Sequence, residues 1–201
     1  MQNQSALNLM SSFEFISILM SIVIGLGVTN LLAGAGRAFY RRRETPMDEV
    51  HIVLTAGTLL LLILQWWVTF RWNTETHWTF DHYLALIIWA VSMYLLTVFL
   101  YPPDLSEAEE HQARFERNRS GYYSSFVVMC LLDIVQAAIH GDLFHPVWYL
   151  PYASQYVLVA ATGLCLRRRR YDRFFAWYLL ITLLVWSLVV RRFLVGDPIS
   201  N

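Results

Sequence analysis

Asp133 is the residue of this chain with the clearest chemical potential, because it is the only acidic residue well inside a long apolar run. Gln136 and His140 follow it at i+3 and i+7, which places all three side chains on one helix face. A charge near the centre of a bilayer costs about 2.5–3.5 kcal/mol, so it normally turns inward toward a partner. We therefore predict that Asp133 binds or transfers a small ion or proton; a structural hydrogen bond to another helix is the alternative.

Two further amides lie at about the depth predicted for Asp133. Gln65 belongs to the second apolar run of the chain and Gln155 to the fifth. We predict that these amides line or stabilise a polar route together with Asp133, Gln136 and His140. Polar side chains in membrane bundles also serve as interhelical hydrogen bonds worth about 0.6 kcal/mol each, so simple packing is the competing interpretation.

Histidines gather near the predicted outer face of the protein. Four of the six occur there beside two aspartates, namely His77, His82, His140 and His145 with Asp81 and Asp142. Imidazole and carboxylate groups are ligands that zinc and copper accept, and histidine in such loops could also sense external pH. Their spacing matches no metal motif, so we expect ordinary loop residues and no bound metal.

The sequence contains no motif for the other common catalytic or cofactor-dependent chemistries. The chain contains no lysine, which excludes Schiff-base chemistry, and no G-x-S-x-G, P-loop, H-E-x-x-H or C-x-x-C motif. Cys130 and Cys165 fall at different predicted depths, too far apart for a disulfide. We expect no cofactor and, on balance, no enzymatic activity.

The apolar runs predict the elements that must position these residues. Charged residues make up 15% of the 201-residue chain and apolar residues 57%, and the charges are bunched between runs of about 20 residues, the length that crosses a bilayer. We predict an all-α, polytopic integral membrane protein, a six-transmembrane-helix bundle in one domain, 1–201, without a soluble domain. The predicted spans are about 13–36, 50–72, 81–101, 121–140, 147–167 and 173–195.

Arginine distribution predicts the orientation of the bundle. Twelve of the fifteen arginines lie in three clusters that follow the first, third and fifth spans: Arg37 and Arg41 to Arg43; Arg114, Arg117 and Arg119; Arg167 to Arg170 and Arg173. Because cytoplasmic loops of membrane proteins are enriched in arginine, we expect both termini outside the cell. The compact chain has no visible targeting sequence, and we expect a multi-pass protein of a bacterial inner membrane.

The first span carries a stripe of small side chains. Residues of this kind recur at every fourth position: Ser17, Ser21, Gly25, Thr29 and Ala33. Small side chains allow two helices to approach closely in lipid, where no hydrophobic force drives association. We predict that the stripe packs tightly within the bundle or between protomers of a homo-oligomer.

The longest loop, 102–120, is the candidate for a cytoplasmic protein partner. Ser106 and Glu109 form a capping-box pattern that predicts a short helix from about 107 to 117. Leu105, Ala108 and Phe115 would rest on the membrane surface. A partner-docking helix and a solvated connector are both compatible with this sequence.

Three classes of function remain, of which a membrane enzyme or metal-binding protein that uses the outer histidines is the least favoured. The first is an oligomeric channel or transporter component for a small ion or proton, with Asp133 at its centre. The alternative is a non-catalytic membrane anchor, sensor or effector that binds a cytoplasmic protein. A net charge of zero gives no general field for nucleic acid, so the lipid bilayer, further copies of the chain and such a partner are the expected contacts.

Overall fold

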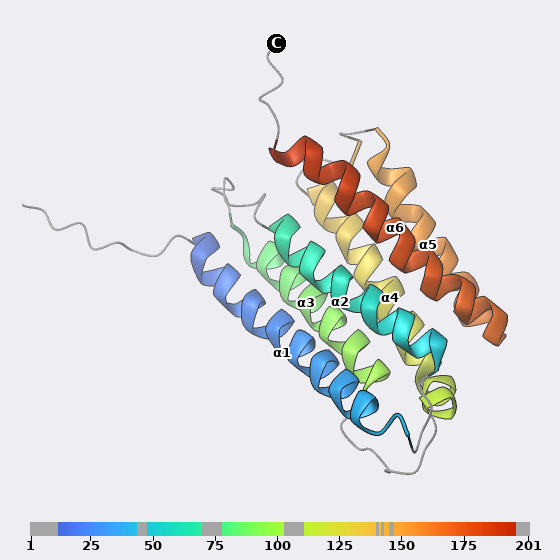
Figure 1. Cartoon of the computed structure of the whole chain (residues 1–201). Helices are drawn as coiled ribbons and strands as arrows, with labels where there is room; N and C mark the ends of the chain where they lie inside the picture. The colour runs from blue at the N-terminus through green and yellow to red at the C-terminus, as the bar shows by residue number, and fades with distance from the viewer. Residues whose placement is uncertain are drawn as a thin grey trace, which may run out of the picture.

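Six α-helices make up the bundle, whose computed structural model describes residues 12–43, 48–69, 78–102, 111–139, 141, 143–144 and 147–195. The helices are α1 (Ser12–Tyr40), α2 (Glu49–Thr69), α3 (Phe80–Leu100), α4 (His111–Ile139), α5 (Tyr149–Cys165) and α6 (Arg169–Val195). They run side by side along a common direction (Figure 1), and no strand occurs among the described residues. The predicted all-α class is confirmed.

The helix bounds follow the predicted spans closely except at α4. This helix begins at His111, ten residues before the predicted start of the fourth span. Nothing from 111 to 121 interrupts a helix, so the second half of the predicted loop helix is simply the first turns of α4; residues 103–110 lie outside the described part. Phe115 is buried against Tyr122, with ring centroids 6.0 Å apart, and the prediction that it rests on the membrane surface is wrong.

The main helix contacts include two pairs that are not consecutive in the sequence, α1 with α3 and α2 with α6. The helix α1 packs against α3 and α2, α3 packs against α4, α4 against α5, and α2 against α6. Large side chains fill the space between them, and those of Trp89, Met93 and Phe126 are almost completely buried. The bundle therefore has a solid core.

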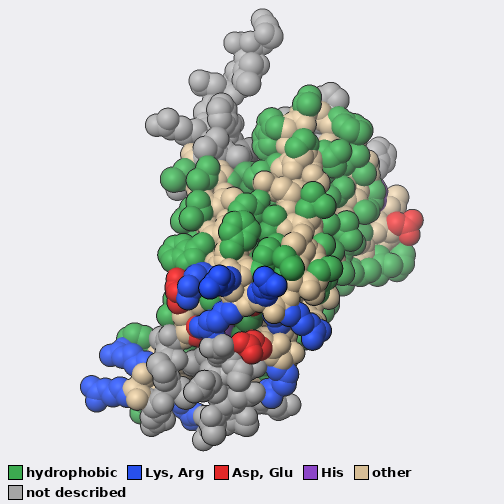
Figure 2. Space-filling model, turned by 90° about the vertical axis from the view of Figure 1, so that its right-hand side faces the viewer, with side chains coloured by type: hydrophobic (Ala, Val, Ile, Leu, Met, Phe, Trp, Pro, Cys, Tyr) green, Lys and Arg blue, Asp and Glu red, His purple; other side chains and the backbone are tan. Residues whose placement is uncertain are grey.

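The outer surface of the bundle is apolar. Side chains such as Leu26, Leu158 and Leu188 are more than half exposed, and Figure 2 shows a broad hydrophobic face above a band of basic side chains. Four helical segments are long and apolar enough to cross a membrane: Phe13–Tyr40, Glu49–Thr69, Phe80–Leu100 and Phe115–Ile139. Exposed apolar surface of this extent is matched to lipid rather than water, which indicates a multi-pass membrane protein.

Glycines on α1 set its close approach to α3. A Cβ atom at Gly34 would overlap the ring of Tyr101, and one at Gly27 would lie 3.3 Å from the methyl group of Thr97. Between these glycines, the Asn30 amide donates to the backbone oxygens of Thr97 at 3.0 Å and Tyr101 at 3.2 Å. The glycines thus allow α1 to approach α3 closely, and the hydrogen bonds of the Asn30 amide hold the two helices together.

Gly34→Ala should therefore destabilise the bundle. The new methyl group must displace the Tyr101 ring, and overpacking of this kind costs about 1–3 kcal/mol. Gly25→Ala is the matched control, because a Cβ atom there meets nothing within 4 Å. Thermal unfolding of the purified variants in detergent should give a clearly lower midpoint for Gly34→Ala alone; equal midpoints would contradict the close approach.

Candidate functional site at the interface of α4, α5 and α6

Asp133 lies half-buried on α4, where it meets the first residue of α5. The Tyr149 hydroxyl donates to the Asp133 carboxylate oxygen Oδ2 at 3.0 Å and lies 3.2 Å from the backbone oxygen of the same residue. This contact ties the end of α4 to the start of α5 across the turn that contains Gly141, whose positive φ of 77° suits glycine. Asp133 therefore has a hydroxyl donor, the kind of partner that stabilises a carboxylate without neutralising it.

The other described residues of the predicted route lie on three helices, α2, α4 and α5. Gln136 is buried on α4, 3% exposed, whereas Gln65 on α2 and Gln155 on α5 are half-buried. Neither Gln65 nor Gln155 makes a side-chain hydrogen bond within the described part of the chain. His140 lies outside the described residues. Hydrogen bonding thus joins Asp133 to Tyr149, and the role of the amides stays a prediction.

The small-residue stripe of α1 points mostly outward. Ser21 accepts a hydrogen bond from the Trp66 indole at 3.0 Å, so the first part of the stripe contacts α2. Further along, Gly25, Thr29 and Ala33 are exposed. Within the chain, α1 uses Gly27 and Gly34 for close packing instead, and packing of the stripe between protomers stays a prediction.

The described residues contain no group of three or more histidine, cysteine, aspartate or glutamate residues that could hold a metal ion. His82 lies in the first turn of α3, half-buried, beside the exposed Asp81. The remaining predicted residues of the histidine cluster, His77, His140, Asp142 and His145, lie outside the described part.

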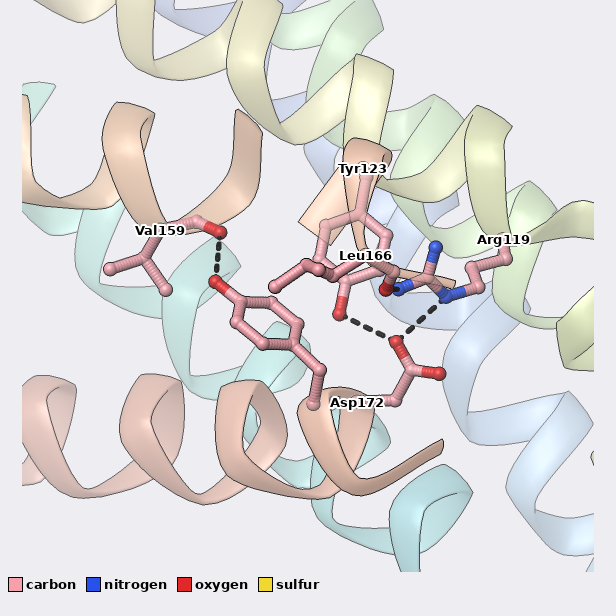
Figure 3. A network of polar contacts seen from close by, with 6 residues as sticks. Arg119, Tyr123, Val159, Leu166 and Asp172 are labelled. Carbon is pink, nitrogen blue, oxygen red and sulfur yellow. Dashed lines mark hydrogen bonds and ion pairs between the residues drawn. The ribbon is translucent and has the colours of Figure 1, made fainter. Parts of the chain in front are cut away.

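A buried ion pair joins the opposite end of α4 to α6. The Arg119 Nε atom lies 2.8 Å from the Asp172 carboxylate oxygen Oδ1, and the two side chains are only 6% and 5% exposed. The same carboxylate oxygen accepts a hydrogen bond of 2.9 Å from the Tyr123 hydroxyl. Figure 3 shows Asp172 between Arg119 and Tyr123. Buried charges are costly unless paired and hydrogen-bonded, and both conditions are met here.

This ion pair also satisfies two helix ends. A terminal nitrogen of Arg119 donates at 2.7 Å to the backbone oxygen of Leu166, the C-cap residue of α5. Asp172 lies in the first turn of α6. Arg119 is thus a cation at the C-terminus of α5, and Asp172 is an anion at the N-terminus of α6. Both charges complement the helix dipoles, so the ion pair stabilises the contact of the α5–α6 turn with α4.

The pair is not predicted from the sequence, because Arg119 follows Arg114 and Arg117 in one charged segment that is predicted to be a loop. The available signal was helical spacing: Tyr122, Tyr123 and Phe126 follow Arg119 at i+3, i+4 and i+7, on the face that α4 buries. Arg119 is therefore part of the core, and Asp172 is its counter-charge.

Aromatic residues occupy the space between the two carboxylates. Fourteen residues separate Asp133 from Arg119, which corresponds to about 21 Å along α4. The hydroxyl oxygens of Tyr152 and Tyr156 are 3.0 Å apart. Further toward Asp172, the rings of Phe126 and Phe175 meet edge-on with centroids 5.3 Å apart. The interface thus has a carboxylate at each end, with a hydroxyl pair and a layer of aromatic rings between them.

The fold and this interface define the class: a helical, multi-pass membrane protein with a carboxylate at each end of one interhelical seam. Comparison with known proteins adds no narrower assignment, since no family model, curated protein or solved structure matches the chain.

Proposed function

We propose that the chain crosses the membrane six times, with both termini outside, and acts as a subunit of an oligomeric channel or transporter for protons or another small ion. The arginine-rich ends of the helices support this orientation, because the described basic side chains gather at one end of the bundle (Figure 2). The outward-facing Gly25, Thr29 and Ala33 supply a surface for a second protomer in a cell membrane of the bacterial inner type.

One observation carries the functional part of the proposal: carboxylates occur at both ends of the α4–α5–α6 interface. Asp133 with Tyr149 forms the outer end of the route, and Asp172 with Arg119 and Tyr123 forms the inner end. The hydroxyl pair of Tyr152 and Tyr156 lies between them. A hydroxyl can accept a proton on a lone pair while it donates its own, so paired hydroxyls suit a proton better than a larger ion.

The aromatic layer makes this conformation a closed one. Phe126 and Phe175 separate the hydroxyl pair from Asp172, and neither ring offers a hydrogen-bonding group. Transfer therefore requires that these rings or the helices carrying them move, as gated transport through a membrane protein generally does.

The alternative function, a non-catalytic anchor or effector, is favoured by the exposed basic surface at the same end. Arg167, Arg168 and Arg170 are exposed and make no ion pair within the described part of the chain. They could attract an acidic cytoplasmic protein, with 102–120 as a further contact. Recovery of a stoichiometric partner from the native host, together with an absence of ion flux, would favour this function.

Proton flux into liposomes tests the proposal. The purified full-length chain, reconstituted with a pH-sensitive dye inside, should acidify the lumen when a potassium diffusion potential is applied. Liposomes without protein should acidify much more slowly. Equal rates with and without protein, at a confirmed reconstitution density, would contradict transport of protons and leave the anchor function.

A further inference from the structure

A groove on the outward surface of α6 is not used by the proposed route. Its volume is about 450 Å³, within the range of roughly 300–1,000 Å³ that ligand sites occupy. Arg170 and Arg173 lie at one end of the groove and Thr182 at the other. The residues between them are mostly apolar or aromatic, namely Phe174, Trp177, Tyr178 and Ile181. The groove therefore changes from cationic to apolar along its length.

The length of the groove matches one leaflet of a membrane. Nine residues separate Arg173 from Thr182, which corresponds to about 14 Å along the helix. Half of a hydrocarbon core of ~30 Å is ~15 Å. With its arginines at the headgroup level, the groove thus extends to about the middle of the bilayer.

The arginines at the mouth of the groove are available to an anion. Arg170 is exposed and makes no hydrogen bond or ion pair within the described residues. Arg173 is 54% exposed, and its Nε atom lies 3.1 Å from Glu49, which also accepts a hydrogen bond of 3.1 Å from the Trp177 indole. Glu49 thus positions Arg173 and Trp177 while the two terminal nitrogens of the guanidinium group stay available. Planar guanidinium groups bind phosphate oxygens in pairs, a geometry that lysine does not offer.

We propose that this groove binds one anionic glycerophospholipid of the leaflet at the arginine-rich end of the bundle. The phosphate lies between Arg170 and Arg173, and one acyl chain lies along Phe174, Trp177 and Ile181. Trp177 is 42% exposed, at the level where tryptophan prefers to meet the headgroup region.

The charge of the groove favours an anionic lipid over a second copy of the chain as its occupant. In a symmetric dimer with parallel membrane orientation, a copy seated on the groove would bring its own Arg170 and Arg173 to the same depth. Like charges at such an interface oppose association. An anionic headgroup instead neutralises both arginines.

Native mass spectrometry of the full chain tests the site. Protein exchanged into nanodiscs of a zwitterionic phospholipid with a small fraction of phosphatidylglycerol is released into the gas phase, and retained lipid is counted. The test variant is Arg170→Gln with Arg173→Gln, and the matched control is Arg42→Gln with Arg43→Gln, an equal charge change at the end of α1. A third variant, Ile181→Trp, fills the groove and keeps every arginine.

We expect the unaltered chain and the α1 control to retain one phosphatidylglycerol per chain. Retention in the groove double variant should be about 25-fold weaker, as two arginines that each strengthen binding to an anionic lipid about fivefold would predict. Ile181→Trp should also lose the lipid, whereas glycerol phosphate should not displace it, since the acyl chain contributes.

Three results would overturn the proposal. Equal loss in the two double variants would indicate diffuse attraction to the surface, and equal retention of zwitterionic lipid would remove the role of charge. A lipid-free dimer that dissociates in Ile181→Trp would show that a second copy covers the groove.

Discussion

Asp172→Ala should lower the free energy of unfolding by about 3–5 kcal/mol, the usual effect of breaking a buried ion pair from one side. The substitution leaves the Arg119 guanidinium buried without its counter-charge and removes the acceptor of the Tyr123 hydroxyl. It also frees the start of α6 from α4. Thermal unfolding of the purified chain in detergent, followed by tryptophan fluorescence, measures the loss.

The exposed ion pair between Arg173 and Glu49 is the matched control. Its side chains are 54% and 49% exposed, and solvent-exposed pairs contribute at most about 1 kcal/mol. Glu49→Ala should therefore shift the midpoint far less than Asp172→Ala. Replacing both buried partners, Arg119→Met with Asp172→Leu, should recover most of the stability, because no charge is then left unpaired. Equal shifts for Asp172→Ala and Glu49→Ala would contradict burial of the pair.

Asp133→Asn should reduce proton flux into liposomes by about 100-fold or more, the lower end of what a positioned proton-transfer group contributes. Asparagine keeps the size of the side chain and can still accept a hydrogen bond from Tyr149, but it cannot carry a proton between the two sides. The fold should therefore survive while the transfer step is lost.

Asp81→Asn provides the matched control for flux. Asp81 is exposed in the first turn of α3 and belongs to neither end of the proposed route. Its variant should transport protons at the rate of the unaltered chain, and both variants should unfold at nearly the same temperature. Full flux in Asp133→Asn would remove this carboxylate from the mechanism and reduce it to a structural contact with Tyr149.

The positions of the helices could be predicted from the sequence because apolar runs of about 20 residues have few alternatives to a helix in lipid. The start of α4 could not. Composition changes from charged to apolar near residue 121, whereas the helix extends back to His111, since backbone hydrogen bonding does not stop at a change of composition. The predicted start therefore marks a change of composition rather than a helix end.

The helix face that packs inside the bundle was harder to predict. Both the stripe containing Gly25 and the face containing Gly34 are small-residue patterns, and the sequence contains no signal for which one meets Tyr101. Which face of α1 is buried depends on the side of α1 on which α3 packs. Likewise, Arg119 and Arg117 belong to the same charged segment, and only the helical spacing of Arg119 with the buried Tyr122 distinguishes the buried arginine from the exposed one in the sequence.

Asp133 illustrates the same limit at the candidate site. Depth along an ideal helix suggested Gln65 and Gln155 as partners, because residues at equal depth can meet. The hydrogen bond instead goes to Tyr149, since α5 packs against α4 and begins beside Asp133. The depth of a residue along its helix thus limits which residues can contact Asp133. The packing of α5 against α4 determines which of them does.

Thiol accessibility in intact cells tests the membrane arrangement most directly. In a chain whose Cys130 and Cys165 are replaced by alanine, single cysteines are introduced as Asp81→Cys, at the start of α3, and as Arg168→Cys, in the arginine-rich α5–α6 turn. A membrane-impermeant maleimide added outside should label the first cysteine, and label the second only after the cells are permeabilised. Labelling of the cysteine at position 168 in intact cells would contradict the arrangement.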